Sequence, residues 1–336
     1  MNSSTLTGRA HELAASVLSA RQLYPVLVDV GASGATPAVW DPIARQSIYV
    51  GFDPDSRDLR EIRDGRFHRA TIVNEAVTVE PGDGTAKFFL THSPYCSSTL
   101  PPDANGLSGY IFSDLFAVER EVEVRATTLN AVFKRLKLPG IDWLKLDTQG
   151  TDLRLYQSLA DELRARVLAV DVEPGLIDAY EGEDLFVQAH TALVREGFWL
   201  SNLLVQGPPR LSRGALAEAL ARRPELDEAT LANTLKPAPG WCEARYLRSL
   251  ESLAQHGAGE RDYLLLWAFA LLDGHSAFAF EAGLVFGRRY SRDAHAASLA
   301  AEALRLLPVK PRPGKTARLK ALIPGPIKRA VKRVLR

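Results

Sequence analysis

The sequence predicts an α/β protein with a doubly wound, mostly parallel sheet and a C-terminal helical appendage. Two apolar runs, 26–28 and 48–52, end on the acids Asp29 and Asp53, with a glycine turn between them. A third run that ends on an acid occupies 143–147. Buried strands joined through glycine turns and helices are typical of this fold, and its ligands bind outside the carboxyl edge of the sheet.

Length and composition indicate a folded protein of ordinary type. The chain has 336 residues, of which 46% are hydrophobic and 24% charged, so general disorder is excluded. Two cysteines, Cys96 and Cys242, cannot build a disulfide framework. No signal segment is visible, and the longest apolar run, 264–272, is too short to span a bilayer. We therefore expect a cytoplasmic protein.

The N-terminal part of the chain is expected to alternate between helices, strands and turns. Leu13, Val17 and Leu18 recur at helical spacing, whereas Pro37 and Pro42 shorten the segment after the glycine turn. The expected elements are a helix at 9–23, a strand at 25–30, a broken helix after Pro37, a strand at 48–52, a helix at 57–63 and a strand at 70–79.

The middle of the chain continues this alternation around one long polar segment. Residues 92–110 are rich in Ser, Pro and Gly, and a loop of this length in a compact domain is usually functional, so we expect it to close over a substrate. Asp147 and Glu173 bring the acids at strand ends to four, all at one edge of the sheet. The expected elements are strands at 87–91, 121–127, 143–147, 167–172 and 198–205 and helices at 128–136, 152–163 and 185–196.

From Gly207 the composition shifts to Ala, Leu, Arg and Glu, which favours helices. The expected helices lie at 213–222, 225–235, 242–255, 260–272 and 291–306. The chain is thus divided into an N-terminal helix at 1–24, a sheet domain at 25–206, a helical appendage at 207–309 and a basic, Pro-rich tail with a short amphipathic helix at 310–336.

The charge is unevenly distributed. From Lys310 onward there are ten Lys or Arg and no acid, and the remaining 31 basic and 40 acidic residues leave 1–309 with a net charge of −9. The tail is interpreted either as a solvated end or as a peripheral anchor on anionic membrane at the inner face. No nucleic-acid contact is expected, because the body is acidic and no aromatic residues interleave with the charges of the tail.

Several motifs resemble those of the FkbM family of S-adenosylmethionine-dependent methyltransferases, which belong to the class I, Rossmann-like group. The motifs are VDVGASG at 28–34, GFDPD at 51–55, SSTL at 97–100, WLKLDTQGTD at 143–152 and VDVE at 170–173. The resemblance covers roughly 25–205. It implies a Rossmann-like sheet, S-adenosylmethionine as cofactor and methyl transfer, with 25–206 as the methyltransferase domain.

The chain departs from the family pattern at three places. Asp53 precedes Pro54 where the family commonly has Glu-Pro, which keeps the carboxylate on a shorter arm. Gln149 and Asp152 stand where the family commonly has Glu. The glycine turn runs into 35–37, Ala-Thr-Pro, in place of a longer helix start.

The residues themselves suit this cofactor. Asp53 lies 22 positions after Gly31, close to the offset of about 20 at which an acid reaches ribose hydroxyls. Asp29 next to the turn disfavours a pyrophosphate and favours a cationic sulfonium. The residues expected to contact the cofactor are Asp29, Gly31, Ser33 and Gly34 of the first turn, then Asp53, and Asn74 and Glu75 at the adenine.

Methyl transfer to a hydroxyl requires a base that takes its proton. Asp147 is the first candidate, because it ends a strand beside the expected cofactor, and Glu173 is the second. We expect an O-methyltransferase that acts on a sugar, a glycan or a related metabolite. The alternative is a catalytically silent module that keeps the fold for binding or scaffolding, which Gln149 and the altered first turn favour.

Simpler interpretations remain open for the same acids. Asp29 and Asp53 could cap helices as turn residues, and Asp147 could cap the helix that begins near Thr151. A divalent metal is a further option that the pattern does not predict, since hard cations take carboxylate oxygens. The acids that would hold it are Asp147, Asp152, Asp171 and Glu173.

Overall fold

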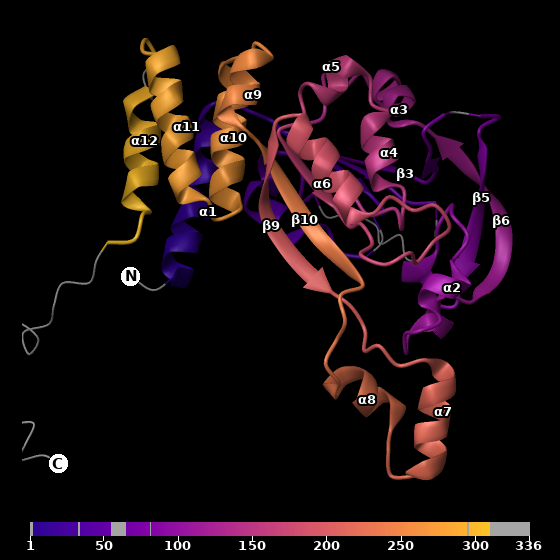
Figure 1. The fold of residues 1–336 in the computed structure, drawn as a ribbon. Helices are drawn as coiled ribbons and strands as arrows, with labels where there is room; N and C mark the ends of the chain where they lie inside the picture. Colours follow the sequence, from indigo (N-terminus) through magenta and orange to yellow (C-terminus); the bar gives the residue numbers. More distant parts are fainter. Residues whose placement is uncertain (1–2, 33, 55–64, 81, 294–295, 310–336) are drawn as a thin grey trace, which may run out of the picture.

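The computed structural model describes residues 3–309 except 33, 55–64, 81 and 294–295. The described chain is a mixed α/β protein in which a mostly parallel seven-stranded sheet is surrounded by helices, with a three-stranded sheet at one side (Figure 1). The helix expected at 57–63, the candidate Ser33 and the basic tail at 310–336 lie outside the described residues.

The first strand of the chain, β1, lies inside the central sheet, and later strands are added on both sides of it. Its order is β3-β2-β1-β7-β8-β10-β9, so the chain moves outward from β1 and then returns to the other side of β1 at β7. β10 pairs antiparallel with both β8 and β9, and the other described pairs of this sheet are parallel. The strands are β1 Val26–Val30, β2 Ile48–Phe52, β3 Arg69–Val73, β7 Trp143–Leu146, β8 Ala169–Val172, β9 Phe198–Gln206 and β10 Trp241–Arg248.

The register aligns the carboxyl ends of the central strands. Val30 of β1 pairs with Phe52 of β2 on one side and with Leu146 of β7 on the other. Leu146 in turn pairs with Val172 of β8. The residues that follow these four strands therefore emerge side by side at one edge, as the sequence predicted.

Each face of the sheet carries its own core, because side chains alternate between the faces along a strand. One core joins Leu27 and Trp143 to six helical elements, and the other joins Val28 and Leu144 to three helices. The first set is α1 Ser3–Ala20, the 3-10 helix η1 Ala38–Gln46, α9 Leu250–Gln255, α10 Glu260–Leu272, α11 Ser276–Arg289 and α12 Ala296–Arg305. The second set is α3 Leu129–Leu136, α4 Asp152–Gln157 and α6 Phe186–Arg195.

One expectation for the C-terminal region was wrong. The helix expected at 242–255 is strand β10 followed by the short helix α9 Leu250–Gln255. Cys242, Ala244 and Tyr246 are all buried and recur with the period of two that a strand requires. The prediction of a helix rested on the Ala-, Leu-, Arg- and Glu-rich composition of the region and not on this period. The division into a sheet domain and an appendage at 207 stays a prediction, although the central sheet takes β10 from beyond that boundary.

Helix α11 was not predicted, because two glycines interrupt its helical pattern. A Cβ on Gly283 would lie 2.6 Å from the backbone nitrogen of Ala300 in α12, and one on Gly287 would lie 2.9 Å from the Ala296 carbonyl. The glycines therefore permit two helices to pack closely. Glycine lowers helix propensity when helices are considered one by one, but here it serves tertiary contact.

Smaller elements surround the carboxyl edge. The three-stranded sheet has the order β4-β6-β5, and the helices α7 and α8 lie between β9 and β10, on the same side of the molecule as α2 (Figure 1). The helix expected at 152–163 is split into α4 and α5. The remaining elements are β4 Ala76–Val77, β5 Thr85–Thr91, η2 Pro94–Cys96, α2 Ala104–Leu107, η3 Ser113–Phe116, β6 Val118–Thr127, α5 Asp161–Arg164, α7 Arg213–Arg222 and α8 Glu228–Thr234.

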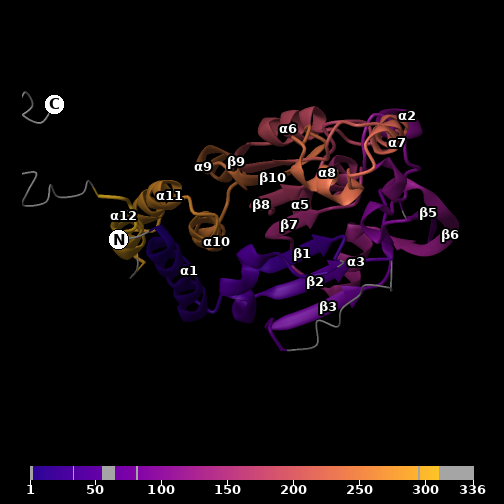
Figure 2. The ribbon, with the colours of Figure 1, turned by 90° about the horizontal axis from the view of Figure 1, so that it is seen from below.

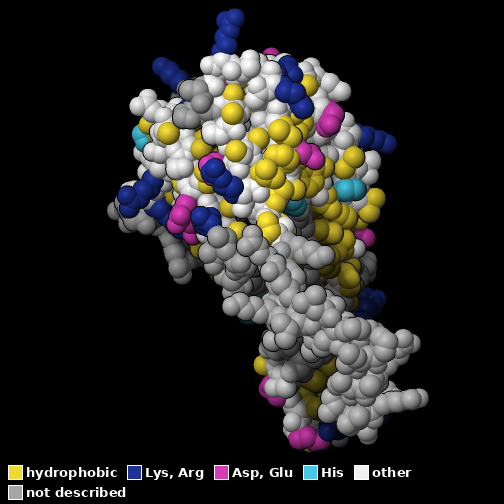
Figure 3. All heavy atoms as spheres, turned by 90° about the vertical axis from the view of Figure 1, so that its left-hand side faces the viewer, with side chains coloured by type: hydrophobic (Ala, Val, Ile, Leu, Met, Phe, Trp, Pro, Cys, Tyr) yellow, Lys and Arg dark blue, Asp and Glu magenta, His cyan; other side chains and the backbone are white. Residues whose placement is uncertain are grey.

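The end of the molecule opposite the small sheet is formed by α1, α10, α11 and α12 (Figure 2). Ten consecutive residues of α10, 263–272, are buried between the sheet and the other helices. Hydrophobic, basic and acidic side chains are mixed on the outer surface of this end (Figure 3). Among the described residues, no helix combines the length and the apolar content needed to cross a membrane.

A buried ion pair joins α10 to the sheet and yields a prediction on stability. Asp142 is 1% exposed, accepts a hydrogen bond from the Val26 N–H at 2.7 Å and pairs with both Nη atoms of Arg261 at 2.6 and 2.7 Å. Asp142→Ala leaves the partly buried guanidinium of Arg261 and the Val26 N–H without this acceptor, so we expect the free energy of unfolding to fall by up to roughly 3–5 kcal/mol.

The measurement is urea denaturation followed by circular dichroism. Asp161→Ala is the matched control, because its pair with Arg164 is equally short at 2.6 Å but the Asp161 side chain is 88% exposed. Its loss should be less than about 1 kcal/mol. Equal losses for the two variants would show that burial of the pair at Asp142 does not matter.

Candidate functional site

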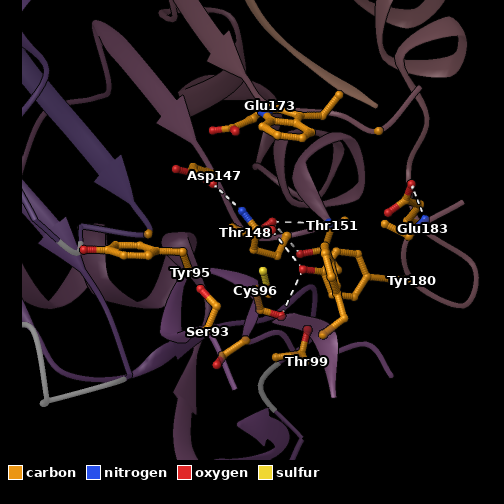
Figure 4. Close-up of a pocket in the computed structure, with 18 of the residues that line it drawn as sticks. Ser93, Tyr95, Cys96, Thr99, Asp147, Thr148, Thr151, Glu173, Tyr180 and Glu183 are labelled. Atoms are coloured by element: carbon orange, nitrogen blue, oxygen red, sulfur yellow. Dashed lines mark hydrogen bonds between the residues drawn. The ribbon is translucent and has the colours of Figure 1, made fainter. Parts of the chain in front are cut away.

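A cavity of about 440 Å³ opens at the carboxyl edge of the sheet (Figure 4). Its floor is formed by the segments that follow β1, β2, β7 and β8, and its roof by the segment between β5 and β6. The residues after the strands are Gly31, Asp53, Pro54, Asp147, Thr148, Gln149, Gly150, Thr151, Glu173 and Gly175. The roof residues are Ser93, Pro94, Tyr95, Cys96, Ser97, Thr99, Phe112, Leu115 and Phe116.

The turn after β1 depends on a glycine. Gly31 has a φ of +86°, and a Cβ at this position would lie 2.1 Å from the Asp147 carbonyl oxygen. The N–H groups of Gly31 and Ala32 both donate to the Phe52 carbonyl at 2.9 Å. These two N–H groups therefore attach the turn to β2. Gly31 forms part of the cavity wall and contributes no side chain to it. Gly34 also has a positive φ but lies outside the cavity wall.

The β2 end of the cavity combines one acid with apolar side chains. Asp53 is 6% exposed and lines the cavity together with Pro54. Ala76, Val77 and Phe88 complete this end. The end thus presents a carboxylate beside a narrow apolar surface, which is the combination that a ribose joined to a flat base requires.

The two residues expected at an adenine lie elsewhere. Asn74 donates from its amide to the Asp53 carbonyl at 2.8 Å, and Glu75 pairs with Arg135 at 3.6 Å. Neither lines the cavity; Ala76 and Val77, two positions further along, do. Asn74 therefore supports the backbone of Asp53. Direct contact of Asn74 and Glu75 with a ligand stays a prediction, and the chain enters β4 directly after them.

Asp29 is also placed behind the cavity wall. It is 2% exposed, and its two oxygens accept from Lys145 Nζ at 3.1 Å and from the Tyr49 hydroxyl at 3.0 Å. Burial raises the pKa of Asp29, while Lys145 and Tyr49 act in the opposite direction. Asp29 does not line the cavity, and direct contact between Asp29 and a ligand stays a prediction.

Asp147 projects into the cavity and is held by two donors. Gln149 Nε2 donates to its Oδ1 at 2.9 Å, and Lys145 Nζ lies 3.4 Å from its Oδ2 (Figure 4). Burial alone would lower the pKa of Lys145, but the carboxylates of Asp147 and Asp29 raise it above its ordinary value. A permanent positive charge thus lies between two acids.

Glu173 lines the same cavity but differs in protonation. Burial, reinforced by the nearby carboxylates of Asp147 and Asp152, raises the pKa of Glu173 to about 9. Near neutral pH its carboxyl group therefore keeps its proton and serves as a hydrogen-bond donor. This state suits Glu173 poorly to the role of base that the sequence assigned to it as second candidate.

Asp152 supports the turn between these two acids. It is 1% exposed, accepts from the Thr148 N–H at 2.9 Å and from its hydroxyl at 2.6 Å, and receives the Glu173 N–H at 2.8 Å. Asp171 is equally occupied, since Arg245 binds both of its oxygens at 2.7 and 2.9 Å. Among the described residues, no group of three or more potential ligands is placed to hold a metal ion.

A second cavity of about 300 Å³ lies on the other side of Asp147 and Glu173. It is bounded by Lys145 and Arg245 on the sheet and by the segment 35–39, apart from residue 36, after the glycine turn. Asp147 and Glu173 thus line both cavities.

The β8 end of the main cavity is aromatic. Phe112 and Trp241 are nearly parallel, with ring centroids 6.1 Å apart and an interplanar angle of 10°, and Tyr180 closes the wall. Burial raises the pKa of the neighbouring Glu183 to about 7. The sequence did not identify Trp241 or Glu183 as site residues, because their positions lie far from the motifs and only the fold brings them there.

The loop expected to close over a substrate does form the roof, and it extends to Phe116. Cys96 of this roof has a pKa raised to about 11 by burial, so its thiol stays protonated and is a weak nucleophile. The chemistry available in the cavity is therefore that of carboxyl groups, hydroxyls and aromatic surfaces.

The family model described as the methyltransferase FkbM domain matches residues 33–198. Residues 33–198 are thus a methyltransferase FkbM domain. The match includes β2, β7 and β8 with their following turns and ends at the first residue of β9. The strand β10 and the helices beyond it, together with Trp241, lie outside the FkbM domain. No curated protein and no solved structure matched the chain.

The protonation of Glu173 predicts a specific dependence of stability on pH. An unperturbed glutamate titrates at about 4.3. Because the pKa is higher in the folded chain, stability is greatest below the unfolded value and is lost as pH rises toward 9. Glu173→Gln removes this loss, so its free energy of unfolding should exceed that of wild type by roughly 1–3 kcal/mol at pH 8 and by almost nothing at pH 4.

Urea denaturation at a series of pH values measures this difference. Glu121→Gln serves as the control, because the Glu121 side chain is 53% exposed and should show no such trend. A constant difference between Glu173→Gln and wild type across the pH range would contradict the assignment.

Proposed function

We propose that this methyltransferase uses S-adenosylmethionine to methylate a hydroxyl of a sugar, a glycan or a related metabolite, within a doubly wound, Rossmann-like domain. The single observation that carries the proposal is the composition of one cavity. It joins the buried acid Asp53, the held carboxylate Asp147 and the aromatic end at Trp241 along one edge of the sheet.

The β2 end of the cavity fits the nucleoside part of the cofactor. Asp53 offers a carboxylate to the two ribose hydroxyls, while Ala76, Val77 and Phe88 provide an apolar surface for the adenine ring. The cavity volume lies within the range of roughly 300–1,000 Å³ that is usual for small-molecule sites. The acids in the middle of the cavity favour a sulfonium, and the described residues that line it include no Lys or Arg to bind a pyrophosphate.

The bound cofactor would supply an electrophilic methyl group. The contribution of the protein is to align the acceptor, to exclude water and to remove the hydroxyl proton. Asp147 is placed for the last task, since each of its oxygens accepts one donor and keeps room for a further hydrogen bond. A proton taken up by Asp147 can leave through the second cavity, which Asp147 also lines.

The β8 end supports a sugar-like acceptor. Phe112 and Trp241 present flat apolar faces on which the C–H groups of a pyranose pack, and Glu173 and Glu183 offer groups that bond to its hydroxyls. We further propose a cytoplasmic enzyme whose basic tail, 310–336, contacts anionic membrane. Membrane-bound glycans would then be accessible acceptors.

Two variants test the division of roles. Asp53→Ala should lower cofactor affinity at least tenfold, since hydrogen bonds to a charged group contribute about 1.5–3 kcal/mol. Asp147→Asn should leave that affinity unchanged within about threefold and reduce turnover by roughly 10²–10⁴. Isothermal titration measures the affinity, and labelled cofactor with a panel of glycans and metabolites measures the transfer.

The control is Asp161→Asn, because Asp161 carries an exposed carboxylate that does not line the cavity. Wild-type protein that binds no S-adenosylmethionine at millimolar concentration would refute the cofactor assignment. Wild-type protein that binds it but methylates nothing in the panel would favour the silent binding module. Full turnover in Asp147→Asn would remove the proposed base.

A further inference from the structure

Gln149 has a backbone conformation that needs an explanation. Its φ is +57°, and the only other described residues besides glycine with a positive φ are Gln22 and Lys137. Lys137 ends α3 and Gln22 follows α1, which are ordinary positions for such a conformation. Gln149 lines the main cavity and costs roughly 1–2 kcal/mol of backbone strain there. Strain of this kind is retained when surrounding contacts require it.

Those contacts are present on every polar atom of its side chain and on its carbonyl. The Gln149 carbonyl accepts from the Ser98 hydroxyl at 2.7 Å. Gln149 Nε2 donates to Asp147 Oδ1 at 2.9 Å, and Gln149 Oε1 lies 2.9 Å from the Tyr180 hydroxyl. That hydroxyl is also 2.9 Å from the Cys96 carbonyl, so its single proton serves both acceptors (Figure 4).

The orientation of the amide follows from these partners. An ionised Asp147 can only accept hydrogen bonds, so the NH₂ group of Gln149 must face it and the amide oxygen must face Tyr180. Lys145 approaches the other Asp147 oxygen, so the carboxylate is held by a donor at each end. Two donors at different oxygens fix the plane of a carboxylate in a way that one cannot.

We infer that Gln149 is a positioning residue that orients the Asp147 carboxylate for the acceptor proton; this rests on the proposed function. An amide is the neutral group that can donate to Asp147 and accept from Tyr180 at once. A glutamate here would place a second carboxyl group 2.9 Å from Asp147. Because Ser98 and Cys96 belong to the roof segment, the orientation of Asp147 also depends on that roof being in place.

The first test is the pH dependence of methyl transfer in Gln149→Glu. A carboxyl group beside Asp147 favours a proton shared between them, since two adjacent like charges disfavour double ionisation. The acidic limb of the pH–rate profile should therefore move upward by about one pH unit or more, with activity recovered at higher pH. A merely structural role would reduce the rate equally at every pH, and that result would overturn the inference.

Two further variants separate the loss of the Gln149 donor from the effect of an added charge. Gln149→Met has a similar length and no donor, so kcat should fall roughly tenfold while the dissociation constant of the cofactor stays unchanged. Gln157→Glu adds the same charge as Gln149→Glu on the exposed side of α4 and should leave the profile as in wild type. An unchanged kcat in Gln149→Met would contradict the positioning role.

A crystal structure of the Gln149→Met variant shows the orientation of the Asp147 carboxylate and requires no methyl acceptor. The Asp147 carboxylate should rotate away from its wild-type plane or occupy two conformers, held by Lys145 alone. An Asp147 that keeps a single wild-type position would overturn the inference. Failure of the proposed function appears differently, as wild-type protein that transfers no methyl group although Asp147 moves in the variant crystal.

Discussion

The ammonium group of Lys145, held between the carboxylates of Asp29 and Asp147, is the interaction on which the site depends. Lys145 lies on β7, in the row of side chains that one face of the sheet presents, and Asp29 occupies the paired position on β1. A buried acid such as Asp29 would be costly without this partner. The same ammonium group then orients Asp147 at the edge of the sheet. The register that pairs β1 with β7 therefore also determines the geometry of the site.

The surrounding acids can be buried because they are stabilised in different ways. Asp29 and Asp171 are paired with Lys145 and Arg245, and Asp152 accepts three N–H or O–H donors of the turn. Glu173 keeps its proton. Asp147 differs from these neighbours because it lines the cavity while Gln149 and Lys145 hold its two oxygens.

Sequence reasoning reached the strands and their ends but not the side-chain network. The apolar runs at 26–28, 48–52 and 143–147 and the acids that end them follow from local pattern, and the structure confirms the alignment of their strands. Asp29 was expected at a ligand because its partner, Lys145, is 116 positions away and no local rule predicts their contact. The sequence marks Gln149 only as a departure from the family pattern, since Tyr180 and Ser98 reach it only through the fold.

The aromatic end of the cavity shows why part of the site lies beyond any local motif. Trp241 begins β10, which enters the sheet between β8 and β9 after the insertion of α7 and α8. That insertion braces the roof, because Arg213 donates to the Ile111 carbonyl at 3.3 Å and pairs with Asp114 at 2.8 Å. The FkbM domain supplies Asp53, Asp147 and Glu173, and the chain outside it supplies Trp241 of the aromatic wall and the support of the roof. The cavity is therefore built from two parts of the chain that the central sheet brings together.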